Sequence, residues 1–93
     1  MASIDVTAYA SASSEWATTF GDEAAVVAGV GAGWTVSVQS APAQGSIRSL
    51  TLSGWEYVAN VAASGTDSCV FRFSPPAGQS VDVTANIGLG SID

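Results

Sequence analysis

Histidine and lysine are absent from this sequence, and cysteine occurs once, as Cys69. A single cysteine excludes an internal disulfide bond and a zinc site built from several thiolates. The missing histidines remove the most common metal ligand and the most common general base. We therefore expect no catalytic residues, no metal site and no cofactor, and we expect that the protein is not an enzyme.

Basic residues are also scarce, because two arginines stand against eight acidic residues and give a net charge of -6. This charge repels the phosphates of nucleic acids and the headgroups of anionic membranes. No apolar run approaches the roughly 18 residues of a membrane span, and the opening MASIDVTAYA lacks the basic start and apolar stretch of a secretory signal. We expect no nucleic-acid partner, no membrane partner and no export address.

The remaining composition is that of one folded domain. Hydrophobic residues make up 47% of the 93 residues, which excludes a disordered chain, and the length allows one core. Apolar and polar residues alternate, as in half-buried strands, in segments bounded by glycine, proline and serine. The segments are 3–10, 16–20, 34–39, 46–52, 55–57, 68–74 and 81–89. This pattern predicts an all-β fold, a β-sandwich of about seven strands.

The small-residue run AAVVAGV, residues 24–30, fits either a strand or a short helix. Glycines at positions 29, 31 and 33 disfavour a long helix, because each costs about 1 kcal/mol relative to alanine in a helix interior. We therefore predict that residues 24–30 form a strand followed by a loop.

Breaks in the alternation mark the ends of the other strands. The apolar residues change from odd to even positions between Ile47 and Leu50, which predicts a bulge or twist of the strand. Ser53 and Gly54 are predicted to form a two-residue hairpin turn. The pair Pro75–Pro76 should end the preceding strand, because proline has no N–H for the sheet.

Two segments show the clearest buried faces. Cys69, Phe71 and Phe73 share one side of their strand, so we expect Cys69 to be a core residue rather than a nucleophile. The last strand has the most regular alternation. Its predicted inward residues are Val81, Val83, Ala85, Ile87 and Leu89.

The segments APAQGSI (41–47), GWEYVAN (54–60) and SGTDSCVFRF (64–73) follow one another at a spacing that resembles bacterial cadherin-like or immunoglobulin-like repeats. Such repeats occur in tandem in large surface proteins and carry a Pro-x-x-Gly turn and a Gly-Thr-Asp-Ser-Phe strand start. The resemblance covers about residues 20–88. It implies an immunoglobulin-like two-sheet sandwich with Greek-key wiring, but it implies no chemistry.

The resemblance divides the chain into an N-terminal strand or arm, residues 1–19, and an immunoglobulin-like sandwich, residues 20–93, within one structural unit. Ala59 replaces the proline of a Tyr-x-Pro-Asn stretch that such repeats carry, and Cys69 replaces the phenylalanine of their strand start. The family's acidic, calcium-binding loop is reduced to GVGAGW, residues 29–34. We expect no calcium there, because this ion requires six or more oxygen ligands.

Each charged residue has a structural interpretation. Asp67 is expected to accept backbone N–H groups and fix its loop. The adjacent Asp22 and Glu23 should lie in a solvated turn. Arg48 and Arg72 should each pair with a nearby carboxylate on the solvent face.

The three tryptophans differ in their expected roles. Trp34 and Trp55 are in register with apolar residues, which favours packing. Trp16 lies in the leading segment and can face either a protein partner or a sugar ring.

These observations lead us to expect a non-enzymatic structural and interaction module, most concretely a bacteriophage virion protein, either a capsid decoration protein or a fibre-like surface protein. It would act through protein-protein contacts with the major capsid protein or another virion protein, as a homo-oligomer or a particle-bound subunit. Residues 2–20 would add a strand to a neighbour and bury apolar side chains there. The predicted interface residues are Ile4, Val6, Tyr9, Trp16 and Phe20.

A second hypothesis is a carbohydrate-binding or adhesive domain of a bacterial surface protein. Exposed tryptophans would then stack on sugar rings. The predicted location is the virion in the first case and the bacterial cell surface in the second.

Overall fold

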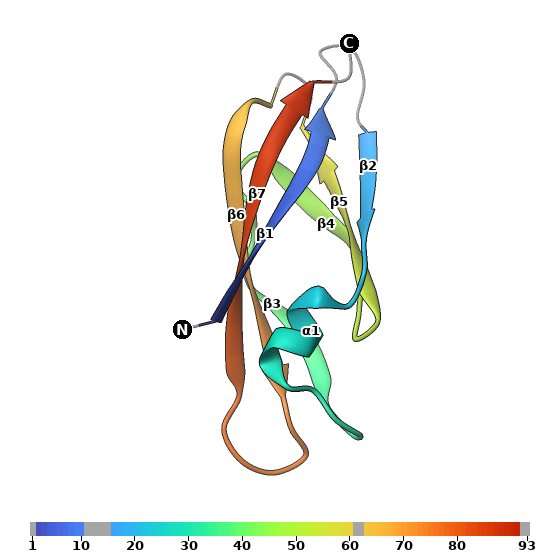
Figure 1. The fold of residues 1–93 in the computed structure, drawn as a ribbon, viewed down its shortest axis with the longest axis vertical. Coiled ribbons are helices and arrows are strands. Elements are labelled where there is room, and N and C mark those ends of the chain that lie inside the picture. The colour runs from blue at the N-terminus through green and yellow to red at the C-terminus, as the bar shows by residue number, and fades with distance from the viewer. Residues whose placement is uncertain (1, 11–15, 61–62, 92–93) are drawn as a thin grey trace.

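The computed structural model describes residues 2–10, 16–60 and 63–91. These residues form seven strands and one short helix (Figure 1). The elements are β1 (Ala2–Ala10), β2 (Trp16–Phe20), α1 (Glu23–Ala28), β3 (Thr35–Ser40), β4 (Gly45–Thr51), β5 (Gly54–Ala59), β6 (Gly65–Ser74) and β7 (Val81–Ser91). In the described part of the chain, no helix is long and apolar enough to cross a membrane.

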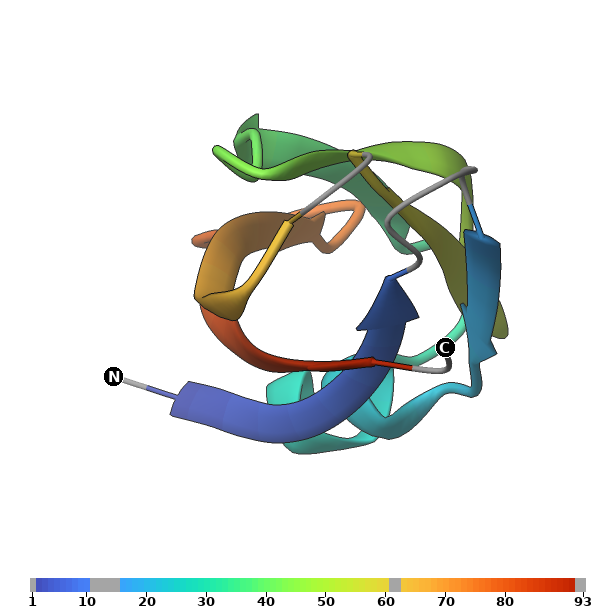
Figure 2. The same ribbon diagram turned by 90° about the horizontal axis from the view of Figure 1, so that it is seen from above.

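The strands form two sheets that face each other around one core (Figures 1 and 2). One sheet has the order β1-β7-β6-β3 and the other the order β2-β5-β4. The prediction of a seven-stranded, all-β sandwich is confirmed. The first strand, β1, joins the sheet that contains the last strand, β7. This β1–β7 pair is parallel, whereas the other strand pairs are antiparallel.

The core lies between the sheets and consists of side chains that alternate inward along the strands. Cys69, Phe71 and Phe73 are buried together, as their shared parity predicts. Trp55 joins the sheets, because its ring centroid lies 4.3 Å from that of Phe20 and 4.8 Å from that of Phe71. The other buried apolar residues are Ile4, Ala8, Ala24, Ala25, Tyr57, Ala59, Val83, Ala85 and Ile87.

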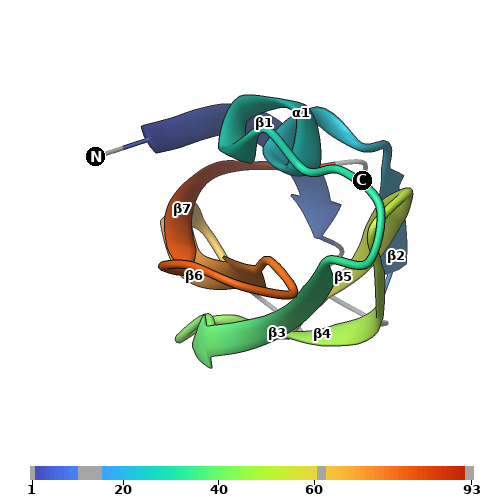
Figure 3. The ribbon, with the colours of Figure 1, turned by 90° about the horizontal axis from the view of Figure 1, so that it is seen from below.

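The prediction of a strand at residues 24–30 is wrong, because residues 24–28 belong to helix α1. Alanine is the strongest helix former, and the buried Ala24 and Ala25 belong to a helix that packs against β1 and β7 (Figure 3). The helix ends at Ala28 and is capped by Gly29, whose φ of 81° is left-handed. The N–H groups of Gly29 and Val30 both donate to the carbonyl of Ala25, which closes the last turn.

The predicted irregularity in residues 46–52 is confirmed by a register shift between Ile47 and Ser49 against β5. The following turn differs by one residue from the prediction, because Leu52 and Ser53 occupy it and Gly54 begins β5. A Cβ at Gly54 would lie 2.6 Å from the carbonyl oxygen of Phe20. Glycine is therefore required here by the close approach of β2 rather than by the turn.

Candidate functional site

The predicted interface residues do not form an exposed apolar surface. Ile4 is only 3% exposed and lies in the core, so the prediction that its side chain is free to contact a partner protein is wrong. Val6 and Phe20 are half-buried and pack against the same core. Tyr9 is 42% exposed, whereas the side chain of Trp16 lies outside the described part of the structure.

The reason is that β1 already has a partner within the chain. β1 pairs with β7 from Ala2 to Ala10, and its alternation turns Ile4 and Ala8 inward. The hydrogen-bonding groups that were expected to recruit a neighbouring protein are therefore used in part by the protein's own last strand. The virion role that depended on this docking stays a prediction and gains no support from β1.

A groove of about 670 Å³ lies on the outer face of β1, β7 and β6, which run side by side (Figure 1). It extends from Asp5 on β1 to Ala43, in the connection between β3 and β4. This volume is in the range of pockets that hold small ligands. The groove is open to solvent and is the candidate binding site of this protein.

Polar side chains from three strands meet in the groove because of the strand register. Asn86 on β7 is paired with Asp5 on one side and with Ser68 on the other. The Asn86 side-chain amide donates a hydrogen bond of 3.1 Å to the Asp5 carboxylate, which orients both groups. Thr66 adds a second exposed hydroxyl residue on β6. A carboxylate, an amide and two hydroxyls together present both donors and acceptors to a ligand.

Glycine and tyrosine shape the groove along β7. Gly88 is paired with Thr66, so the central strand has no side chain at that point of the groove. A Cβ at Gly88 would meet nothing closer than 3.8 Å, which shows that there is space above it. Further along the same face, the ring of Tyr9 lies over Gly90, where an added Cβ would come within 3.2 Å of it. An exposed aromatic ring therefore stands beside the polar groove.

A buried carboxylate beneath the groove fixes its wall. Asp67 accepts hydrogen bonds from the backbone N–H groups of Ala43 at 2.9 Å, Gln44 at 3.0 Å and Ser68 at 2.8 Å. It also accepts a bond of 2.7 Å from the hydroxyl of the fully buried Tyr57. The prediction that Asp67 accepts backbone N–H groups is confirmed, although two donors belong to a segment more than twenty residues earlier. Asp67 thus ties β6, β5 and the β3–β4 connection together.

Gln44 reinforces the same wall. Its side-chain amide donates to the carbonyl oxygens of Ser64 at 2.8 Å and Thr66 at 2.9 Å, and its oxygen accepts from the Ser64 N–H at 3.3 Å. These bonds hold the start of β6 against the connection that carries Ala43. The groove is therefore formed by fixed backbone and needs little rearrangement to receive a ligand.

Burial and hydrogen bonds shift the pKa values of three titratable groups in the core, Asp67, Tyr57 and Cys69. Burial by itself raises the pKa of Asp67, but the hydrogen bonds from Tyr57 and three backbone N–H groups outweigh it and leave the pKa below its usual value. Burial and the bond to Asp67 raise the pKa of Tyr57 well above its usual value. Burial raises the pKa of Cys69 to about 12, so this thiol stays protonated and unreactive at neutral pH.

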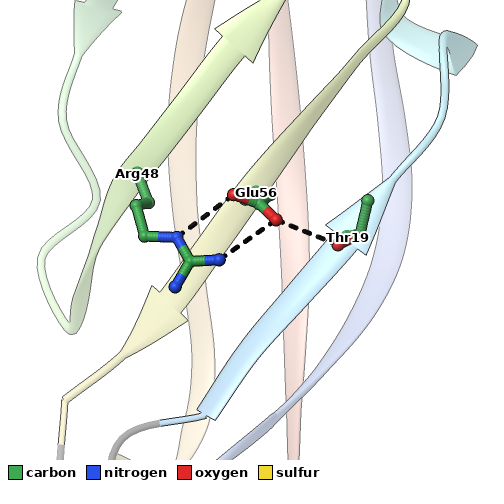
Figure 4. Close-up of polar contacts among 3 residues, drawn as sticks. All are labelled: Thr19, Arg48 and Glu56. Carbon is green, nitrogen blue, oxygen red and sulfur yellow. Dashed lines mark hydrogen bonds and ion pairs between the residues drawn. The ribbon is translucent and has the colours of Figure 1, made fainter.

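Both arginines form the expected surface ion pairs. Arg48 Nε and Nη2 each donate to Glu56 at 3.1 Å, and Thr19 donates to the same carboxylate at 3.4 Å (Figure 4). The hydrogen bond from Arg48 holds the pKa of Glu56 below its usual value. Arg72 makes the equivalent pair with Asp82, at 2.8 and 3.1 Å.

We expect Arg48→Ala to leave the urea midpoint of unfolding unchanged within error. The Arg48 side chain is largely exposed, and water and salt weaken such pairs almost completely. Denaturation followed by tryptophan fluorescence, with the wild-type protein measured in parallel, provides the check. A clear drop in the midpoint would show that this network contributes more than a surface pair.

The groove residues were not identified from the sequence. Asp5, Ser68 and Asn86 looked like ordinary solvent-facing positions of three separate strands, and Thr66 lay outside the predicted strands. Only the register of β1, β7 and β6 brings them together. The available signal was the unusual Gly88 within the most regular strand, because glycine in a strand interior often marks a close approach or a ligand.

The described residues form a small two-sheet sandwich with an open polar groove on the outer face of the four-stranded sheet. No protein-family model matches the sequence, and no curated protein sequence matches it. Among solved structures, the chain is similar to part of an endo-fucoidan hydrolase from glycoside hydrolase family 107, with a TM-score of 0.59 and 14% sequence identity. The alignment covers 100% of this chain but only 13% of that chain. At this identity the similarity shows the fold alone.

The solution structure of amebosin also aligns, over 94% of this chain and 95% of that chain, at 13% identity. Its TM-score of 0.29 is too low to support any argument about the fold or the function.

Proposed function

We propose that this protein is a non-catalytic carbohydrate-binding module that holds a neutral oligosaccharide in the β1–β7–β6 groove. The observation that carries the proposal is the meeting of Asp5, Asn86, Thr66 and Ser68 around the open space above Gly88. Each sugar hydroxyl both donates and accepts hydrogen bonds. The groove offers a carboxylate and an amide to the same ligand, which matches that requirement.

Tyr9 supports the same ligand class. It lies four residues from Asp5 on the same face of β1, which corresponds to about 13 Å of strand. An oligosaccharide lying along β1 contacts the polar groove and the exposed ring together. Aromatic side chains provide apolar contact area for the C–H faces of sugar rings while staying accessible to water.

Charge selects neutral sugars over acidic ones. The groove contains the Asp5 carboxylate, and the whole chain has a net charge of -6. An anionic polysaccharide meets repulsion both at the site and at long range. The ligand class is inferred from this chain's own groove, because the similarity to part of an endo-fucoidan hydrolase shows the fold alone.

The arrangement of carboxylates supports binding rather than hydrolysis. Most glycoside hydrolases use two carboxyl groups that flank the bond, one of them with a raised pKa. Asp5 and Asp67 are the groove's two acidic residues, but Asp67 is 9% exposed and accepts four hydrogen bonds. Its lowered pKa is the opposite of what a general acid needs.

Gly88→Thr is expected to weaken sugar binding at least tenfold, because its side chain occupies the space into which the ligand fits. The measurement is isothermal titration calorimetry with the cello-, xylo-, manno- and laminari-hexaoses, starting from those that the wild type binds. Gly21→Thr is the matched control, since a Cβ at Gly21 meets nothing within 4 Å and this position lies outside the groove. Equal affinities for wild type and Gly88→Thr, or no binding of any of the four sugars by the wild type, would refute the proposal.

A further inference from the structure

Strand β3 forms an edge of the four-stranded sheet and differs from the other edges in having little protection. Of its six residues, TVSVQS, none is charged and none is proline, and only Val36 is partly shielded from solvent. In the described residues, β3 pairs with β6 alone. An open edge of this kind is a template for pairing with another strand.

The other edges carry features that discourage pairing. β4 contains Arg48 and the register shift at Ile47–Ser49. β1 contains Asp5 and contacts helix α1. β2 has only five residues. The regularly paired part of β3, from Thr35 to Val38, is therefore the best available edge for a second chain.

We propose that β3 pairs antiparallel with β3 of a second copy of this chain and joins the two four-stranded sheets into one. The alternation of β3 makes it self-complementary. Residues directly opposite each other in an antiparallel pair lie on the same face of the sheet. A two-fold axis through Ser37 therefore places Val36 opposite Val38 of the second copy, so that apolar residues meet on one face.

This register explains an exposed apolar side chain. Val38 is 39% exposed although it shares parity with the partly buried Val36. The contact with Val36 of the second copy removes Val38 from water, and each dimer gains this contact twice. The unpaired backbone edge of β3 is satisfied at the same time.

Charge permits this approach despite the net charge of -6 on each copy. Ser37 is paired with Arg72 on β6, and Arg72 is joined to Asp82 at 2.8 Å, so the nearest charges cancel. The more distant carboxylates repel one another through solvent, where salt screens them beyond about 8 Å at physiological ionic strength. We therefore expect association to strengthen as salt is added.

Sedimentation equilibrium tests the proposal with two Val→Lys variants. The wild type is expected to reach twice the 9.3 kDa mass of the chain at high concentration. Val38→Lys is expected to raise the dissociation constant at least tenfold, because an edge lysine blocks strand pairing. Val26→Lys is the matched control with the same charge change, since Val26 is 68% exposed on α1. A wild type that stays monomeric, or an equal effect of both variants, overturns the proposal.

A cysteine variant tests the register without disturbing the edge. Opposed Cα atoms in an antiparallel pair lie about 4.5–5.5 Å apart, which a disulfide bond accepts. Ser37→Cys is therefore expected to form a covalent dimer under mild oxidation, whereas Ser46→Cys, at an exposed position on β4, is not. The native Cys69 is 1% exposed and does not compete. Equal crosslinking of the two variants excludes the Ser37-centred pair.

Discussion

Asp67→Ala is expected to lower the free energy of unfolding by about 4 kcal/mol, because it removes a buried acceptor shared by four donors. The hydroxyl of Tyr57, which is fully buried in the intact fold, loses the carboxylate that accepts its hydrogen bond. The N–H groups of Ala43 and Gln44 lose their partners as well, which frees the β3–β4 connection. A domain of this size has a stability of roughly 5–15 kcal/mol, so this loss brings it close to unfolding.

Urea denaturation at neutral pH measures this loss, and two variants separate its causes. Tyr57→Phe removes one donor and keeps the carboxylate paired with three N–H groups, so its cost should be smaller, at about 1–2 kcal/mol. Asp82→Ala removes a partly exposed carboxylate from the same sheet and should have a much smaller effect on the midpoint than Asp67→Ala. If Asp67→Ala were as stable as Asp82→Ala, the central structural role of Asp67 would be wrong.

Alkaline pH is expected to destabilise the fold more strongly than mild acid. Folding raises the pKa of the Cys69 thiol from 9.0 to about 12, and burial raises the pKa of Tyr57 above its ordinary 10.0. A group whose pKa is higher in the folded state stabilises that state fully below its unfolded pKa and loses this contribution as pH rises. Stability should therefore be nearly constant between about pH 5 and 8, where the chain has no histidine to titrate, and should fall above pH 9.

The alkaline loss is measured as the difference between urea midpoints at pH 7.5 and 10.5. Cys69→Ala and Tyr57→Phe are each expected to show a smaller difference than the wild type, whatever their absolute stability. Asp67 has the opposite pH dependence, because its pKa is lowered in the folded state. Its contribution to stability is fully present above its ordinary pKa of 3.8 and is lost in stronger acid. If the difference between the two urea midpoints were identical in the wild type and both variants, these buried groups would not control the loss of stability at alkaline pH.

Features confined to one strand were predictable from the sequence. The alternation around Phe71 and Phe73 indicated their buried face, and the parity break after Ile47 indicated the irregularity in β4. Helix α1 was missed because a short run of alanine and valine satisfies both strand and helix patterns. The helix is favoured by its packing on β1 and β7 and by the left-handed conformation of Gly29. Neither of these features can be read from the composition of the run.

Features that depend on strand pairing were not predictable. Ile4 was assigned to a partner surface because nothing in residues 3–10 shows that β7 is their neighbour. The groove has the same origin, since Asp5 and Asn86 are separated by most of the chain and meet only through the parallel β1–β7 register. Asp67 was interpreted correctly as an acceptor, but its bonds to Ala43 and Gln44 depend on how the sheets connect.

Chemical-shift mapping with neutral hexaoses on the ¹⁵N-labelled protein is the most direct test of the proposed binding face. The account predicts saturable shifts that concentrate on the amides of Asp5, Ser68, Asn86 and Gly88, with a weaker response at Tyr9 and none around α1. Shifts that are absent for all the hexaoses, or that gather on the β2-β5-β4 sheet, would contradict it.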